Sequence, residues 1–248
     1  MKKMNWFLWT LLLLIAPTLQ SCDDDEGYSI GDFSWDWATV RTVGSGSYFL
    51  EGDRWGTIWP AATAIPNFKP VDGERIVAYF NPLSDDFQGY DVAVKMEHVR
   101  PVLTKTVETL TAENEAEYGN DPIVIYQGDM WLGGHYLNLV FQQQIPMEKK
   151  HRISLVENST DTYEEDGYVH LELRYNTYDD KTSYWQLSPV SFNLLPFYPS
   201  ESENAVLKGF KIKINSKTNG ERVLVLDLNQ PVARPENANN ISAESHLK

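Results

Sequence analysis

Hydrophobic and polar residues alternate along most of this chain with the two-residue period of β-strands. In the segment 168–175, Val169, Leu171 and Leu173 share one face and polar residues occupy the other, and the segment 210–215 repeats the pattern. Such alternation gives a strand one buried face and one solvated face, as in antiparallel sheets that pack into a sandwich. With six or seven short strands of this kind, the second half of the chain predicts a β-sandwich.

The first half of the chain has strands that are close together and interrupted by Gly and Pro. The segment 75–80 is apolar on both faces, which predicts a central strand, and the turn at 44–46 predicts a hairpin. Closely spaced, curved strands favour a small closed barrel, because closure leaves no exposed sheet edge. The predicted strands are 33–43, 47–51, 57–59, 74–81 and 88–99 in this half, and 123–126, 136–142, 152–157, 168–175, 190–195, 210–215 and 222–228 in the second.

The two halves meet at a segment with helical rather than strand character. Thr111 is a suitable N-cap, Glu115 lies where it would favour the positive end of a helix dipole, and Gly119 can end the helix. These signals predict one short helix over 112–118. The same segment, 109–121, is the expected linker between two domains, because Pro122 then starts a new extended run.

The N-terminus has the layout of a bacterial lipoprotein signal peptide. Two lysines precede an apolar run over 6–19, which is shorter than the ~20 residues that a membrane-spanning helix needs. The expectation is a signal peptide over 1–21 and acylation of Cys22, which anchors the protein in a membrane. Since Cys22 is the single cysteine, no thiol then remains for a disulfide, a metal site or a nucleophile.

An acidic cluster follows Cys22 directly, and it admits two compatible interpretations. Asp23, Asp24, Asp25 and Glu26 can serve as a solvated tether, 22–32, because neighbouring like charges favour an extended backbone. The cluster also resembles the export signal of Bacteroidota lipoproteins that reach the outer face of the outer membrane. The expected location is therefore the outer membrane with the protein at the cell surface, and a periplasm-facing protein is the alternative. At the other end, 231–248 lacks an apolar period and is expected to be a flexible tail.

Composition narrows the class of partner. The 248 residues have a net charge of −14, and 42% of them are hydrophobic, enough to form folded cores. An acidic protein is a poor ligand for nucleic acid, whose affinity comes mainly from phosphate neutralisation by Lys and Arg. We therefore expect no nucleic-acid partner, and we expect contact with the membrane to be made through the N-terminal lipid.

The sequence contains no motif that assigns a chemical reaction. His98, His135, His151 and His170 are far apart and lack the spacing of a two-histidine metal motif. No nucleophile elbow, phosphate-binding loop or calcium loop is present. We expect no metal, no cofactor and no enzymatic activity. A glycosidase with two carboxylates stays an open alternative, because acidic residues are abundant.

Four tryptophans of the first half are the candidate ligand-binding residues. Trp35, Trp37, Trp55 and Trp59 occur within the first hairpin and the strand after it, and Trp35 and Trp37 share one face. Such rings can fill the core of a small barrel. They can equally form an exposed platform for a ligand, and the acidic balance of the chain then favours a neutral glycan or a basic protein surface.

Taken together, a set of short motifs resembles the NigD-like lipoproteins. The most distinctive are Ile58-Trp59-Pro60-Ala61-Ala62-Thr63 and Met130-Trp131-Leu132-Gly133-Gly134. The other matching segments are 31–33, 69–75, 89–90, 110–114, 119–122, 136–138, 166–168, 174–176 and 190–192. The resemblance implies an all-β fold class, with an N-terminal OB-type barrel (33–108), a linker helix (109–121) and a C-terminal β-sandwich (122–230). It brings no catalytic residues.

The leading functional hypothesis is a lipid-anchored cell-envelope protein that acts as a non-enzymatic binding or interaction module. The family takes its name from a bacteriocin-associated operon, which suggests a role in bacteriocin handling or immunity with an unknown protein partner. The second hypothesis is a glycan-binding accessory surface lipoprotein that uses the four tryptophans. The third is an enzyme that acts on envelope polymers.

Overall fold

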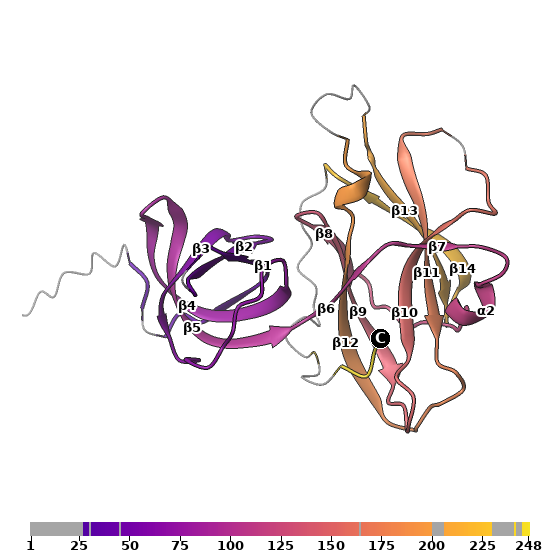
Figure 1. The fold of residues 1–248 in the computed structure, drawn as a ribbon, viewed down its shortest axis with the longest axis horizontal. Helices are drawn as coiled ribbons and strands as arrows, with labels where there is room; N and C mark the ends of the chain where they lie inside the picture. The colour runs from indigo at the N-terminus through magenta and orange to yellow at the C-terminus, as the bar shows by residue number, and fades with distance from the viewer. Residues whose placement is uncertain are drawn as a thin grey trace, which may run out of the picture.

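The computed structural model describes residues 27–29, 31–44, 46–163, 165–199, 206–229, 241 and 245–248. Cys22 and the acidic cluster 23–26 lie outside these ranges. Within them the chain is almost entirely β-structure, arranged as a barrel followed by a larger sandwich (Figure 1). The predicted all-β fold class, with one short helix, is confirmed.

The barrel consists of five strands and is closed by pairing of its first strand with its fourth. Only β3 and β5 run parallel; the other pairs are antiparallel. The core contains Val40, Leu50, Ile58, Ile76 and Phe80, each fully buried. The strands are β1 (Ser34–Thr42), β2 (Tyr48–Gly52), β3 (Gly56–Thr63), β4 (Arg75–Phe87) and β5 (Tyr90–Pro101), in the closed order β1-β2-β3-β5-β4.

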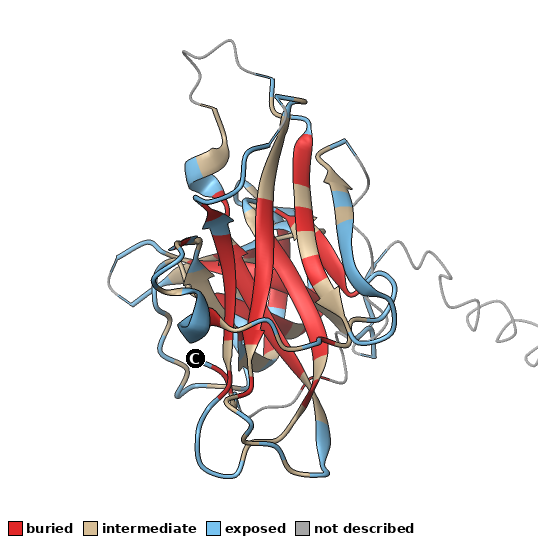
Figure 2. Ribbon diagram, turned by 90° about the vertical axis from the view of Figure 1, so that its right-hand side faces the viewer, coloured by how far each residue is buried: buried red, intermediate tan, exposed pale blue. Residues whose placement is uncertain are grey.

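The sandwich packs a five-stranded sheet against a four-stranded sheet. Figure 2 shows buried residues along the length of its strands, and the core includes Leu139, Phe141, Leu155, Phe192 and Phe210. The first sheet has the order β14 (Gly220–Asp227), β13 (Gly209–Ser216), β11 (Tyr168–Asn176), β10 (Arg152–Asn158), β7 (Glu108–Leu110). The second has the order β6 (Leu103–Thr106), β12 (Trp185–Asn193), β9 (Tyr136–Gln144), β8 (Met130–Gly133).

The change from barrel to sandwich occurs directly after β5, before the predicted linker. β6 and β7 pair with β12 and β10, so both belong to the sandwich sheets although the sequence placed residues up to 108 in the barrel. Three strands, β6, β7 and β8, were not predicted. They are three or four residues long, too short to show a periodic pattern, and they exist because a long neighbouring strand offers backbone hydrogen bonds.

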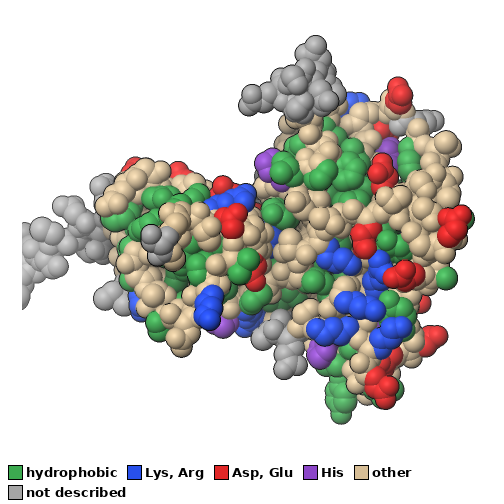
Figure 3. Space-filling model, viewed as in Figure 1, with side chains coloured by type: hydrophobic (Ala, Val, Ile, Leu, Met, Phe, Trp, Pro, Cys, Tyr) green, Lys and Arg blue, Asp and Glu red, His purple; other side chains and the backbone are tan. Residues whose placement is uncertain are grey.

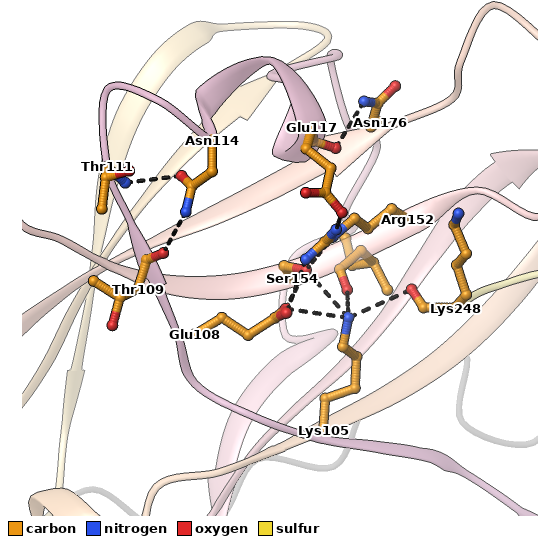
Figure 4. A network of polar contacts seen from close by, with 11 residues as sticks. Lys105, Glu108, Thr109, Thr111, Asn114, Glu117, Arg152, Ser154, Asn176 and Lys248 are labelled. Carbon is orange, nitrogen blue, oxygen red and sulfur yellow. Dashed lines mark hydrogen bonds and ion pairs between the residues drawn. The ribbon is translucent and has the colours of Figure 1, made fainter.

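The helix α2 (Glu115–Tyr118) is shorter than predicted, and Asn114 rather than Thr111 stands at its N-cap position. The Asn114 side chain accepts a hydrogen bond from the Thr111 N–H (2.8 Å) and donates one to the Thr109 carbonyl (3.0 Å), which stabilises the preceding turn. Figure 4 shows the ion pairs around Arg152 of β10. The Arg152 guanidinium binds Glu117 of α2 and Glu108 of β7, and Glu108 also binds Lys105 of β6 at 3.3 Å.

The described part of the C-terminal segment is not the flexible tail that the sequence predicts. Ile241 and Leu247 are each 3% exposed, Ile241 at the contact between barrel and sandwich and Leu247 in the sandwich core. Residues 246–248 pair with the start of β10: the His151 N–H donates to the His246 carbonyl (3.0 Å) and the Lys248 N–H to the His151 carbonyl (2.9 Å). The apolar contacts of this segment come from two isolated residues, Ile241 and Leu247, so no periodic pattern in the sequence predicts them.

The barrel and the sandwich share a small apolar contact, called here the joint, made by Trp37, Val77, Val102, Trp131, Val140 and Ile241. The rings of Trp37 and Trp131 meet edge to face at 4.8 Å. Beside them the buried Arg75 guanidinium makes a two-pronged ion pair with Asp53 (2.7 and 2.9 Å) and binds Asn138 of β9 (3.0 Å). A Cβ on Gly133 would lie 2.1 Å from the Asp53 carboxylate, so glycine is required for this close approach.

Candidate functional site

The structure separates the four candidate tryptophans into three environments. Trp37 is 2% exposed and fills the joint against Trp131, so its ring has no surface for a ligand. This burial removes Trp37 from the candidate binding residues. The reason is the packing of the sandwich on the outer face of β1, which no local pattern could predict.

Trp35 and Trp55 are half-buried, and protein groups cover part of each ring. The Arg54 guanidinium lies over the Trp35 ring at 4.5 Å and donates a hydrogen bond to the Trp35 carbonyl (2.6 Å). Trp55 packs edge to face on Phe80 of the barrel core at 5.4 Å, and Tyr28 lies 6.4 Å from it on another side. These contacts give both rings a mainly structural role.

Trp59 lies in a different setting, on the outer face of the barrel. Its ring stacks on Tyr90 with centroids 4.8 Å apart and an angle of 26°, and Phe49 lies 5.4 Å from Tyr90. All three side chains are half-buried. The neighbouring residues Leu50 and Ile58 point into the core, so strand alternation directs Phe49 and Trp59 outward. We call Phe49, Trp59 and Tyr90 the aromatic face.

Polar groups frame the aromatic face. The Asp91 carboxylate accepts hydrogen bonds from the N–H and the hydroxyl of Thr57 (2.6 and 2.7 Å), and these bonds lower the pKa of Asp91. On β1 and β2, Arg41 and Glu51 form an exposed ion pair at 2.7 Å. The surface therefore combines flat rings with donors and acceptors of both charge signs.

The turn between β2 and β3 fixes the position of Trp59. The buried Asp36 carboxylate accepts the backbone N–H groups of Arg54 (2.9 Å) and Trp55 (3.0 Å), and its burial raises its pKa. Gly56 has a φ of 65°, a conformation that favours glycine, and a Cβ there would lie 2.3 Å from the Asp91 carboxylate. The aromatic face thus stands on a rigid hairpin rather than on a mobile loop.

Sequence analysis missed Phe49 and Tyr90 as partners of Trp59. Phe49 is recoverable from the pattern, because Leu50 pairs with Ile58 and alternation then places Phe49 and Trp59 on one face. Tyr90 begins β5, which lies beside β3 only in the closed barrel. Its contribution depends on the parallel β3–β5 pairing between distant segments, for which the sequence carries no local signal.

The described residues form no cluster of three or more His, Cys, Asp or Glu side chains suited to a metal ion. Of the four candidate histidines, His151 is buried in a hydrogen-bonded network, where its Nδ1 accepts the Tyr175 hydroxyl (2.6 Å) and its Nε2 donates to the Asp180 carbonyl (2.6 Å). Among the described residues, no helix has the length and apolar character needed to cross a bilayer.

Residues 37–102 match the NigD-like N-terminal OB domain, and residues 106–228 match the NigD-like C-terminal beta sandwich domain. The chain belongs to the NigD-like family. The resemblance inferred from short motifs is thereby confirmed, and the two matched regions meet close to the end of β5, where the sheets also change.

Solved structures share this two-domain architecture. A protein of unknown function from Bacteroides vulgatus is 26% identical with a TM-score of 0.74, covering 85% of this chain and 100% of that one. A Parabacteroides distasonis protein described as toxin-related is 29% identical with a TM-score of 0.66, over 80% and 94%. A NigD-like immunity protein from Bacteroides caccae is 19% identical with a TM-score of 0.58, over 79% and 94%, and shares the fold. A comparison with curated proteins finds no match.

Proposed function

We propose that this chain is a lipid-anchored, non-enzymatic binding module of the outer membrane that acts in bacteriocin handling or immunity. In this proposal acylated Cys22 holds the protein in the membrane, and Asp23, Asp24, Asp25 and Glu26 direct it to the cell surface. Membership of the NigD-like family supports an envelope role. The similar Parabacteroides protein, described as toxin-related, supports the link to toxins.

The observation that carries the binding role is the aromatic face. Tyr and Trp rings supply large, rigid contact areas at low conformational cost and are enriched where proteins bind one another. In OB barrels the outer surface of the second and third strands is the usual ligand surface, and here that surface holds Phe49 and Trp59. The joint uses β1 and β4 instead, which leaves the aromatic face available to a partner.

The anchoring part of the proposal is tested by cell fractionation and surface labelling. The wild type should remain with the outer membrane and react with a membrane-impermeant amine reagent on intact cells, whereas Cys22→Ala should appear in the soluble fraction. Replacement of residues 23–26 by alanine should keep the protein in the membrane and abolish its labelling. If the wild type stays unlabelled while surface controls react, the acidic cluster is only a spacer.

The immunity part is tested by survival of cells that express the lipidated protein. Sensitive cells are exposed to bacteriocin-containing supernatants of related strains, and the expected result is protection by the wild type that falls at least tenfold with Trp59→Ala. Trp185→Ala, a change at a 43% exposed tryptophan of the sandwich, is the matched control and should protect fully. Equal protection by empty vector and wild type against every supernatant contradicts the proposal.

A second candidate function, glycan binding, is favoured by the near-parallel stack of Trp59 on Tyr90 beside hydrogen-bonding groups. Aromatic rings contact the apolar face of a pyranose, and carboxylates and hydroxyls bind its hydroxyl groups. Titration calorimetry with neutral oligosaccharides should then give binding that Trp59→Ala abolishes and Trp185→Ala preserves. Absence of heat with every neutral oligosaccharide in the set would reject this candidate and leave the protein partner.

A further inference from the structure

The sandwich has one closed side and one open side. On one side the edge strands of the two sheets are β6 and β7, which follow each other directly in the chain and so connect the sheets. On the other side the edge strands are β14 and β8. Near one end of the open side a single extended segment bridges the sheets, because Ile123 pairs with Ser216 and Val124 with Gln142. Beside it a groove of about 480 Å³ is lined on one side by β14 and the end of β13, and on the other by residues 125–128 and Met130, which lead into β8.

The floor of this groove is formed by residues of the sandwich core that other parts of the chain do not cover completely. Met130, Ile214 and Leu224 line it, and all three pack in or against the main apolar cluster of the sandwich. The core-facing residues of β14, Leu224 and Leu226, are only half-buried, whereas Phe210 and Ile212 of the neighbouring strand are fully buried. Apolar surface is therefore left for an occupant with hydrophobic side chains.

The edge beside the groove is suited to strand pairing. β14 keeps one continuous register with β13 from Ser216↔Gly220 to Gly209↔Asp227, without a bulge or a proline. Its outer edge has no partner strand in the part of the chain that the structure describes. A long, regular edge of this kind presents a row of unpaired backbone N–H and C=O groups, which is a template for an added strand.

The charge at the groove is opposite to that of the protein. The chain has a net charge of −14, but the groove is lined by no carboxylate, and its single charge is that of exposed Arg222. Within the described ranges, Arg222 forms no ion pair, whereas neighbouring Glu221 accepts a hydrogen bond from Asn120. Alternation places Arg222 on the groove side of β14, with Leu224 and Leu226.

We propose that this groove binds an extended peptide segment of a partner protein, which adds to the sandwich as a strand next to β14. Its alternate apolar side chains cover Met130, Ile214 and Leu224, and an acidic side chain pairs with Arg222. Strand addition supplies affinity through the backbone and specificity through alternate side-chain pockets. An acyl chain would fill the groove but leave the β14 edge without hydrogen bonds, which favours the peptide. The site is independent of the aromatic face.

A labelled synthetic peptide tests this site. The probe is an eight-residue peptide of alternating valine and threonine with one terminal aspartate, titrated by fluorescence anisotropy against the full mature chain with Cys22→Ala. Binding should weaken at least tenfold with Arg222→Glu and recover when the aspartate of the peptide is replaced by lysine. Lys69→Glu, which makes the same charge change at an exposed position of the barrel, should bind like the parent. Amide exchange should slow in β14 and not in β8.

Several outcomes overturn the proposal. Equal binding by the parent and Arg222→Glu, or protection of amides away from β14, rejects the assigned surface, as does an absence of binding. Dimers at micromolar concentration with protected β14 amides would assign the edge to a second copy of the chain. Arg222-dependent binding of palmitate without peptide binding would assign the groove to an acyl ligand.

Discussion

At the scale of single residues, the pair of Arg75 and Asp53 is the most deeply buried of the ion pairs among the described residues. Both side chains are almost fully buried, and Asn138 binds both of them. Removing Arg75 would leave an uncompensated carboxylate in a low-dielectric site, so Arg75→Met should lower the free energy of unfolding by about 3–5 kcal/mol. Arg41→Met, which breaks an exposed pair, should cost less than about 1 kcal/mol. Urea denaturation compares them, and equal losses would contradict this account.

Buried His151 makes stability depend on pH. Its burial lowers its pKa below the ordinary value, so the unfolded chain takes up the proton first as the pH falls. The stabilising effect is therefore complete above the unfolded pKa of about 6.5 and is lost progressively below it. Asp180 and Asp121 raise the pKa of His151 and Lys181 lowers it, but burial has the largest effect. His151→Gln should reduce the loss of the free energy of unfolding between pH 7 and 5, as measured by urea denaturation at each pH, and an unchanged loss would contradict this account.

At the scale of elements, β4 shows what a sequence pattern can and cannot reveal. The segment 75–80 at the start of β4 is apolar on both faces, and the prediction of a central strand followed from that alone. Ile76 and Phe80 do point into the barrel core, but Val77 on the other face packs in the joint against the sandwich. The period predicted burial of both faces correctly. It could not identify the second partner, because that contact joins residues far apart in the chain.

The C-terminal segment is an element that sequence analysis missed and that contributes to stability. Leu247 lies in the sandwich core beside β10, so Leu247→Ala should lower the free energy of unfolding by about 2–5 kcal/mol. Leu195→Ala, at a 53% exposed leucine, should change it by less than about 0.5 kcal/mol. Amide exchange at Ile153, which donates to the Lys248 carbonyl at 3.3 Å, should accelerate only in the first variant. Unchanged exchange there would contradict the pairing of this segment.

At the scale of the whole molecule, the joint connects two domains. Figure 3 shows acidic and basic side chains intermixed over the lower part of the sandwich, and hydrophobic side chains gathered both on the visible side of the barrel and on the upper part of the sandwich. Fold class and the existence of two domains were predictable, because strand periods are local. The aromatic face was predictable through Trp59 and Phe49 but not through Tyr90, which joins it by the parallel pairing of β3 with β5.

Trp37 provides the test of this coupling. Trp37→Ala removes the ring that meets Trp131 and should cost about 3–5 kcal/mol. Because the joint is small, we expect barrel and sandwich then to unfold in two separate calorimetric transitions, and the wild type to unfold in one. Trp185→Ala, away from the joint, should keep the single transition. A single transition in Trp37→Ala at unchanged temperature would show that the joint contributes little to cooperativity.

The central claim is that the anchored protein binds an envelope partner through the aromatic face. The most direct measurement is a quantitative pull-down from intact cells of the lipidated wild type, Trp59→Ala and Trp185→Ala, with Cys22→Ala as the unanchored control. We predict that wild type and Trp185→Ala capture the same envelope component and that Trp59→Ala loses at least nine-tenths of it. Equal capture by Trp59→Ala would contradict the claim.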